Sequence, residues 1–554
     1  MQTLDLAPDE LIIDNFACGG GASKGIEMAL GRSPDYAINH DPEAIALHTA
    51  NHPATTHLCE DIWDVNPREL IRGVDGAWRR VGLVHLSPDC KHFSKAKGGK
   101  PVSKKIRGLA WIAMRWASLP GHAKPRVMTL ENVEEFTTWG PLVVDETGNA
   151  RPCPRRKGYT FRSFVKQWRR HGFNVEWRER RAYKDGAPTI RRRLFIIARS
   201  DGQPIAWPED EFDDPKSSAV QAGHAKPWRT AADCIDWSIP CPSIFATEEE
   251  AKRLKIKRPL AYPTQARIAR GIDRFTLRAA QPFIVPITHS SKTGRPDGRV
   301  HDIGQPLRTI TTTAFMVQQN GGPRNTAISG HAATDPLSTI QSSGSQQTLA
   351  TANMIKLRGT ATAQGLDSPA PTIAAQGQHE GLSLASLVKY YGEGGQDQGL
   401  DDPMHTATAK ARFGLTRADA QQQNGLSEEQ RYAAWWIARW FDEFVPEEKS
   451  FTPAPRRRLL SVALEDGSTW VIVDIGMRML TPRELYRAQG FPDSYIIEIE
   501  VPRRIGKKTV MRPLPIDAQN RMCGNSVPPP MMRAIIAANF RRPPPCFSQE
   551  RVVA

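Results

Sequence analysis

The stretch that decides the fold reads Leu11-Ile12-Ile13-Asp14-Asn15-Phe16-Ala17-Cys18-Gly19-Gly20-Gly21-Ala22-Ser23. An apolar run of strand type enters a glycine-rich turn, and we expect a helix over residues 24–30. Glycines at such a turn let the backbone approach a cofactor at the helix N-terminus. The turn alone fits a nucleotide, a dinucleotide or an S-adenosyl cofactor, and it also fits tight packing.

Short apolar runs alternate with amphipathic stretches over residues 11–200. After Leu11-Ile12-Ile13 come Tyr36-Ala37-Ile38, Leu83-Val84-His85-Leu86, Val127-Met128-Thr129-Leu130 and Leu194-Phe195-Ile196-Ile197-Ala198. This rhythm predicts a doubly wound, Rossmann-like α/β domain. Ligands of such folds bind beyond the carboxyl ends of the strands, so the residues after each run are candidates for a site.

Composition limits the class of protein. The chain has 554 residues, 40% hydrophobic and 24% charged, which predicts two or more globular domains. No apolar stretch of about 18 residues occurs, and residues 1–10 lack the layout of a signal peptide. We therefore expect a soluble, cytoplasmic protein with no membrane partner.

The net charge of +15 favours a polyanionic partner, with nucleic acid the leading candidate, although basic surfaces also serve solubility. The eight cysteines include no CxxC pair and no zinc-finger spacing, so we expect reduced thiols and no metal site.

A composition rich in Gly, Pro, Ser, Thr and Gln begins after residue 207 and predicts a second, mostly β or irregular domain. We expect a catalytic domain over 1–207, completed by 510–545, and a second domain over 208–509. Prolines 306, 336, 369 and 403, which are 30, 33 and 34 residues apart, mark an internal repeat over 283–415. The repeats are either scaffold or carriers of polar tips such as 292–299 that reach DNA. An aromatic-rich helix over 427–447 is expected to pack in a core.

Strand candidates lead the repeat units. They are Phe283-Ile284-Val285, Phe315-Met316-Val317, Met354-Ile355-Lys356 and Leu387-Val388-Lys389.

Three polar segments lie next to apolar runs of the first domain: two follow a run and the third precedes one. One loop reads Ser87-Pro88-Asp89-Cys90-Lys91-His92-Phe93-Ser94, in which Lys91 and His92 favour a thiolate at Cys90. Glu131-Asn132-Val133 ends a run, and Thr189-Ile190-Arg191-Arg192-Arg193 enters another. Glu131 is an acid/base candidate. Singly, each segment also fits a structural role: a buried thiol, a helix cap or a solvated basic face.

Together these segments resemble the DNA cytosine-5 methyltransferase family of phage and bacterial type, over residues 11–200 and 474–540. The matching motifs are Phe16 to Gly21, Ser87 to Ser94, Glu131-Asn132-Val133, Arg191 with Arg193, Arg478 to Pro492, and Gly524-Asn525-Ser526-Val527-Pro528. The resemblance implies methyl transfer from S-adenosyl-L-methionine to carbon 5 of a flipped cytosine in a specific double-stranded DNA sequence.

The resemblance also implies the site. Catalytic roles fall to Cys90, Glu131, Asn132, Arg191 and Arg193, and cofactor binding to Phe16, Ala17, Cys18, Gly20, Gly21, Asn39, Asp61, Ile62, Pro88, Asn525 and Ser526. Cys90 would attack carbon 6 of the base, Glu131 would hold N3 and the exocyclic amine, and Arg193 would bind O2. Asn132 would brace the nucleophile loop.

The chain departs from the family pattern at five positions. Cys18 stands where glycine is usual, Asp89 where proline is, Lys91 where glutamine is, Thr189 where glutamine is, and Asn39 where the family has an acidic ribose contact. A Rossmann oxidoreductase would share the glycine turn but would not need the other motifs. A DNA-binding relative without catalysis would not need Cys90, Glu131 and Arg193 together. We expect a monomer, and the resemblance leaves open a cognate restriction endonuclease as partner.

Overall fold

The computed structural model describes most of the chain before residue 278 and after residue 412. The described residues are 6–89, 108–144, 150–277, 403–404, 413–445, 459–463, 469–505 and 508–540, together with short strands at 283–285, 312–314, 316–318, 347–349, 382–389 and 397–398. The predicted nucleophile Cys90 and most of the repeat region, including its 292–299 tip, lie outside these residues.

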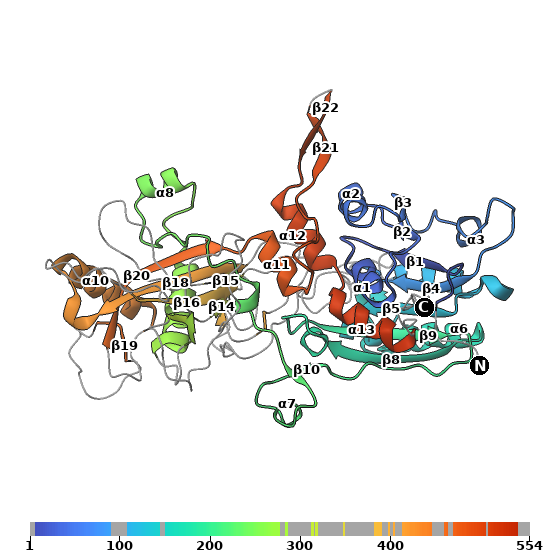
Figure 1. Cartoon of the computed structure of the whole chain (residues 1–554), viewed down its shortest axis with the longest axis horizontal. Coiled ribbons are helices and arrows are strands. Elements are labelled where there is room, and N and C mark those ends of the chain that lie inside the picture. The colour runs from blue at the N-terminus through green and yellow to red at the C-terminus, as the bar shows by residue number, and fades with distance from the viewer. Residues whose placement is uncertain are drawn as a thin grey trace, which may run out of the picture.

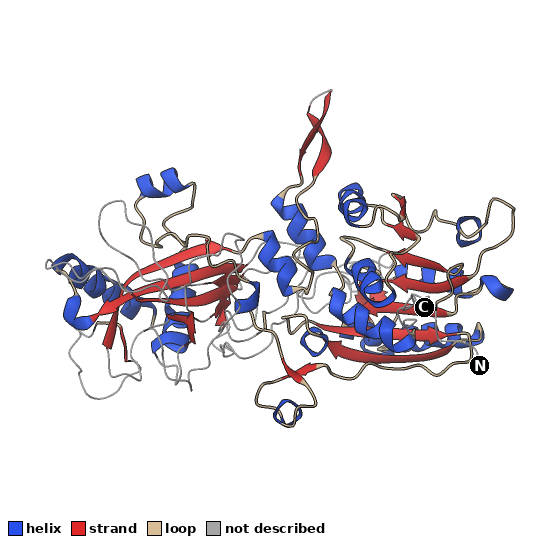
Figure 2. Cartoon of the chain, viewed as in Figure 1, coloured by secondary structure: helices blue, strands red, loops and turns tan. Residues whose placement is uncertain are grey.

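The first sheet has seven strands in the order β3-β2-β1-β4-β5-β9-β8 (Figures 1 and 2). Their bounds are β1 Leu11–Asn15, β2 Tyr36–Ile38, β3 Thr56–Leu58, β4 Val81–Leu86, β5 Val127–Asn132, β8 Asn174–Arg181 and β9 Arg192–Arg199. Strands β1 to β5 are parallel, whereas β9 is antiparallel to β5 and β8 to β9. The strand order reverses between β1 and β4, so the loops after these two strands open at one edge of the sheet.

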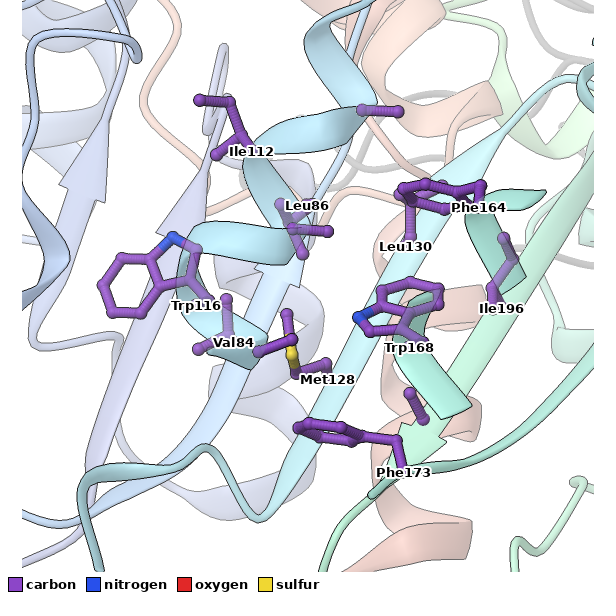
Figure 3. Packing of buried hydrophobic residues seen from close by; sticks show 14 of the residues in the cluster. Val84, Leu86, Ile112, Trp116, Met128, Leu130, Phe164, Trp168, Phe173 and Ile196 are labelled. Carbon is purple, nitrogen blue, oxygen red and sulfur yellow. The ribbon is translucent and has the colours of Figure 1, made fainter. Parts of the chain in front are cut away.

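Helices cover both faces of this sheet. One face packs against α5 (Ile112–Ala117) and α6 (Tyr159–Arg170), and Figure 3 shows Val84, Met128 and Ile196 meeting Trp116 and Trp168 there. The other face packs Ile12, Leu83 and Val127 against α1 (Gly21–Leu30) and α13 (Pro529–Asn539). Neighbouring residues of a strand, such as Ile12 and Ile13, thus enter different cores, which is why the strands read as continuous apolar runs.

A second sheet lies on the other side of the molecule (Figure 1). Its order is β12-β13-β16-β18-β15-β20-β19, with β14 on β15 and β17 on β16. The strands are β12 Phe283–Val285, β13 Thr312–Ala314, β14 Met316–Gln318, β15 Gln347–Leu349, β16 Leu382–Lys389, β17 Asp397–Gln398, β18 Phe413–Gln422, β19 Ser461–Ala463 and β20 Thr469–Met479. Helices α9 (Tyr262–Ile272) and α10 (Glu428–Phe444) bury apolar side chains, among them Ile268 and Phe441, in one core with Ile472 and Ile475 of β20.

The remaining described elements are shorter or connect the two sheets. They are α2 Pro42–Asn51, α3 Pro67–Leu70, α7 Ser218–Gln221, α8 Glu248–Leu254, α11 Pro482–Ala488, α12 Ile516–Asn525, and the strand pairs β6 Leu142–Val144 with β7 Ala150–Pro152, β10 Phe212–Asp213 with β11 Lys226–Pro227, and β21 Glu500–Ile505 with β22 Lys508–Pro513. In the described part of the chain, no helix combines the length and the hydropathy needed to span a bilayer.

The structure confirms the α/β class and the five predicted strands of the first sheet. The strand expected before Asp61 is β3, whereas β8 was not predicted. The predicted aromatic helix is α10, and Trp440 is buried as expected, but Trp436 is 44% exposed and does not belong to the core. Of the strand candidates in the repeats, 283–285 is β12, 316–317 lies in β14 and 387–389 ends β16, while 354–356 lies outside the described residues. The domain limits at 207/208 and 509/510 stay a prediction.

Gly25 provides a test of the packing between α1 and α13. A Cβ atom at this position would lie 2.5 Å from the Met532 Cβ and 2.5 Å from the Pro529 carbonyl oxygen. Gly25→Ala should therefore lower the free energy of unfolding by about 1–3 kcal/mol, measured by denaturant titration, because the two helices must separate. Met28→Ala on the exposed side of α1 is the control and should change it by less than about 0.5 kcal/mol. A Gly25→Ala protein more stable than wild type, as helix propensity alone would predict, would contradict this packing.

Candidate active site

The segments singled out in the sequence meet at the carboxyl edge of the parallel strands. The glycine-rich turn follows β1, Ser87-Pro88 follows β4, and Glu131 and Asn132 end β5. These three strands are neighbours in the order β1-β4-β5. Pro88 is buried and Asp89 is the last described residue of its loop, so the position of Cys90 stays a prediction.

A buried ion pair joins β5 to β9. The Arg193 Nε lies 2.8 Å from the Glu131 Oε1, and these side chains are only 3% and 9% exposed. The Glu131 Oε1 accepts no hydrogen bond from the described residues. The Arg193 Nε faces this oxygen as an ion-pair partner, so the carboxylate is held in place while its remaining lone pairs can accept from a donor on a ligand.

Asn132 ties the start of the nucleophile loop to the same strand. Its Nδ2 donates to the Pro88 carbonyl oxygen at 3.0 Å, and its Oδ1 accepts from the Val133 amide at 2.9 Å. The amide is 1% exposed, and both of its ends are engaged. This contact agrees with the bracing role expected for Asn132.

Arg191 contacts a different part of the chain from Arg193. Its Nη1 donates to the Gly524 carbonyl oxygen at 3.1 Å, and its backbone amide donates to the Thr189 Oγ1 at 3.3 Å. The side chain of Arg191 is buried, as is Thr189. The structure therefore brings the two predicted arginines to different partners: Arg193 to the acid and Arg191 to the last motif of the family.

The glycine-rich turn is held in an unusual backbone conformation. Phe16 and Cys18 have φ values of 64° and 46°, in the left-handed region that non-glycine residues rarely adopt, and Gly20 has φ 79°. The Tyr495 hydroxyl donates to the Gly19 carbonyl oxygen at 2.8 Å, and a Cβ on Gly20 would lie 2.2 Å from that hydroxyl. Such conformations cluster at ligand sites and need a surrounding that enforces them, here Tyr495.

The last motif packs directly on this turn. A Cβ on Gly21 would lie 2.1 Å from the Val527 carbonyl oxygen. Asn525 is exposed, whereas the Ser526 hydroxyl is buried and donates to the Met522 carbonyl oxygen at 2.7 Å. Of this predicted pair, Asn525 is thus the residue that presents a polar group outward.

The other predicted cofactor residues lie after β1, β2 and β3. The Asn39 Oδ1 accepts from the Asp41 amide at 2.9 Å, and the exposed Asp61 accepts from the Trp63 amide at 3.1 Å through its Oδ1. Ile62 is 7% exposed and belongs to the core, Ala17 is buried, and Cys18 is half-buried. All of these residues belong to the carboxyl edge of β1, β2 and β3.

Four buried or half-buried polar residues next to the glycine-rich turn form a hydrogen-bonded series that was not predicted from the sequence. The Ser23 hydroxyl donates to the Asp14 Oδ2 at 2.6 Å, the His48 Nε2 lies 2.8 Å from the Ser23 Oγ, and the His48 Nδ1 lies 2.8 Å from the His57 Nε2. His52, one turn after His48 on α2, contacts Glu27 and Ser33. The spacing of four residues between His48 and His52 was the available signal. No three His, Cys, Asp or Glu side chains in the described residues are arranged to hold a metal ion.

Burial sets the protonation of this chain of residues. It raises the pKa of Asp14 to about 7, against the lowering effect of the Ser23 hydrogen bond. It lowers the pKa of His48 well below its usual value and also lowers those of His52 and His57. These imidazoles are therefore neutral at neutral pH, since burial disfavours their charged form.

The fold and the buried acid–arginine pair define an α/β protein with a polar site at the carboxyl edge of its sheet. The sequence model of C-5 cytosine-specific DNA methylases matches residues 11–236 and 342–541, and the chain belongs to this family.

Curated relatives match the chain over part of its length. Type II methyltransferase M1.HphI of Haemophilus parahaemolyticus is 25% identical over 213 residues, 38% of this chain and 52% of the relative. M.SacI of Streptomyces achromogenes is 27% identical over 212 residues, 36% and 50% of the two chains. The chain spans about half the length of these relatives. Among solved structures, the Dnmt2 methyltransferase of S. pombe has a TM-score of 0.41 at 12% identity and covers 96% of this chain and 98% of that one.

The lowered pKa values of four buried or half-buried histidines predict that the stability of the protein depends on pH. Burial lowers the pKa of His85 to about 3, and His48, His52 and His57 shift in the same direction. A histidine with a lowered folded pKa contributes stability that is present above its unfolded pKa of 6.5 and lost as the pH falls. The raised pKa values of Asp14 and Asp185 act in the opposite sense, but the four imidazoles outnumber them.

The melting temperature should therefore fall by on the order of 5 °C between about pH 7.5 and about pH 5.5. Thermal unfolding followed by circular dichroism measures it, and His85→Gln should make the fall shallower. An equal or higher melting temperature in acid would contradict the dominance of these imidazoles over the two carboxyl groups.

Proposed function

We propose that the protein is a DNA cytosine-5 methyltransferase that transfers a methyl group from S-adenosyl-L-methionine to carbon 5 of a flipped cytosine in a specific double-stranded sequence. The observation that carries the proposal is the buried Glu131–Arg193 pair, whose Oε1 accepts no hydrogen bond from the described residues. It lies at the strand end beside the loop that leads to Cys90, and Asn132 fixes the start of that loop. Family membership supports the same reaction.

Cys90, Glu131 and Arg193 act on different atoms of the cytosine base. The Cys90 thiolate adds to carbon 6, and the electrons of the ring then make carbon 5 nucleophilic. Glu131 holds the proton at N3 and accepts from the exocyclic amine, while Arg193 donates to O2, so both compensate the charge that develops on the ring. After methyl transfer, loss of the carbon 5 proton and elimination of Cys90 restore the aromatic base. Arg191 acts as a positioning residue through the Gly524 carbonyl.

The residues at the carboxyl edge fit S-adenosyl-L-methionine. The left-handed backbone at Phe16, Cys18 and Gly20 turns the chain tightly where the cofactor's amino-acid part would lie, and Tyr495 holds that shape. Asn39 would meet the ribose, and Asp61 the adenine amino group. When bound, the cofactor supplies an electrophilic methyl group.

The substrate must present its base outside the helix. The target atoms are inaccessible in stacked DNA, and flipping costs a few kcal/mol, which contacts to the phosphates must offset. The net charge of +15 suits this role. We propose that loops of the second sheet and residues 208–509 read the sequence. The protein would act as a monomer in the bacterial cytoplasm, with or without a cognate restriction endonuclease.

Bisulfite sequencing of a methylation-free bacterial host that expresses the protein tests the reaction. Cytosines in one short sequence context should resist conversion in cells with the wild type. With Cys90→Ala all should convert, because the thiolate that activates the ring is lost. DNA binding by Cys90→Ala, measured by fluorescence anisotropy, should persist. Protected cytosines in the Cys90→Ala cells would overturn the assigned nucleophile, and soluble wild type that protects none would overturn the proposed reaction.

Asn39→Asp tests the cofactor assignment. The two side chains have the same shape and both accept from the Asp41 amide, but a carboxylate accepts stronger hydrogen bonds from the ribose hydroxyls. S-adenosyl-L-methionine should bind about five-fold tighter, measured by calorimetry, from a gain of about 1 kcal/mol. Asn66→Asp at the N-cap of α3 makes the same charge change on an exposed loop, and its affinity should equal that of the wild type. Unchanged or weaker binding by Asn39→Asp would remove Asn39 from the ribose site.

A further inference from the structure

The β21–β22 hairpin stands away from both sheets. It lies between α11 and α12 in the sequence and projects above them in Figure 1, and Figure 2 shows its two strands without a third. Val501 at its base is 2% exposed, whereas Thr509, Met511 and Arg512 are exposed, Met511 by 55%. Isolated two-stranded hairpins are marginally stable in water, so this one is poorly explained as a packing element.

Basic side chains concentrate on one face of the hairpin. The register pairs Val501 with Arg512, Arg503 with Val510 and Ile505 with Lys508. Residues that pair across the strands share a face, and so do alternate residues along each strand. Arg503, Lys508 and Arg512 therefore lie on the same face, and Arg504 lies on the other. Glu500 at the base is the one acidic residue of the two strands.

An ion-pair network joins the middle of strand β21 and helix α12 to the N-terminal end of helix α2. Arg503 pairs with Glu43, and Arg521 of α12 pairs with Asp41 and with Glu43, the latter at 2.7 Å. Within the described residues, neither Lys508 nor Arg512 takes part in an ion pair. Lys508 near the turn and Arg512 opposite Val501 near the base thus remain available to an anion, one on each side of Arg503 along the hairpin.

This ion-pair network places the hairpin at the edge of the sheet that carries the acid–arginine pair. Glu43 lies in the first turn of α2, which follows the carboxyl end of β2, and Glu131 lies at the carboxyl end of β5. β2 and β5 are three strand positions apart, about 14 Å, and a six-residue strand extends about 20 Å. The separation of the two strands and the length of the hairpin are both of the same order as the diameter of a DNA duplex. A duplex with a base at Glu131 would therefore lie within reach of the hairpin.

We propose that the β21–β22 hairpin is an arm that grips the backbone of duplex DNA flanking the target cytosine, with Lys508 and Arg512 as phosphate contacts. This inference rests on the proposed function, because it takes duplex DNA as the substrate. Cations set against phosphates release condensed counterions, so the arm would add salt-sensitive affinity without sequence preference. The ion pair with Glu43 orients the hairpin, whereas the contacts with phosphate come from Lys508 and Arg512.

The test measures the affinity of the full-length protein for a duplex of about 30 base pairs at several salt concentrations. Wild type is compared with the double variant Lys508→Ala/Arg512→Ala. The slope of log affinity against log salt should become shallower by about 2, since each lost phosphate contact contributes about 0.9. Arg512→Glu should weaken binding further than Arg512→Ala.

The control is Lys166→Ala/Arg170→Ala, which removes the same charge from exposed positions of α6. The C-terminus of α6 leads into β8, whose first residue pairs with the carboxyl end of β9. The carboxyl end of β9 in turn pairs with the amino end of β5, which is the end of that strand opposite Glu131. The slope of this control should match that of wild type. If the wild type binds and methylates DNA but the hairpin variant keeps the wild-type salt slope, the role of the hairpin is overturned and the proposed function stands. Wild type that neither binds nor methylates duplex DNA would overturn the proposed function as well.

Discussion

The site depends on the burial of the charged Glu131 and Arg193 side chains between β5 and β9. Removing two charges from water costs several kcal/mol each, and their attraction only partly offsets that cost, so such a pair seldom adds net stability. What it provides is geometry: β9 runs antiparallel to β5 and fixes the arginine beside the acid. The same two strands are packed by Phe195 and Ile197 on one face and Leu194 and Ile196 on the other, which leaves the pair little freedom to relax.

Polar contacts between distant parts of the chain then shape the rest of the site. Arg191 reaches the carbonyl of Gly524, and Tyr495 reaches the carbonyl of Gly19. One bond ends in the last turn of α12 and the other in the glycine-rich turn after β1. The cofactor turn, the acid–arginine pair and the last motif are therefore held as one unit. A substitution that moves one of them should also shift the positions of the other two.

The sequence was informative where local pattern and packing agree. The strands buried on both faces were predicted, as were the motifs at their ends. β8 was missed because its residues Asn174–Arg181 are mostly charged, and only pairing with β9 makes them a strand. His48 and His57 looked like separate polar residues, since their contact depends on how α2 packs on the turn. The basic hairpin was not predicted, because it lies between the two C-terminal motifs, Arg478 to Pro492 and Gly524 to Pro528.

The packing of α1 against α13 has a consequence for the synthesis of the protein. The core that contains Ile12, Ala22 and Ile26 also contains Val527, Met531 and Ile535, more than 500 positions later in the sequence. The first sheet is complete at Arg199, yet this face cannot be covered until residues 527–540 have been synthesised, which at 5–20 residues per second takes roughly 17 to 70 seconds more. During that interval the N-terminal half exposes an apolar surface that a chaperone would recognise, while the second sheet, whose strands are closer in sequence, can already assemble.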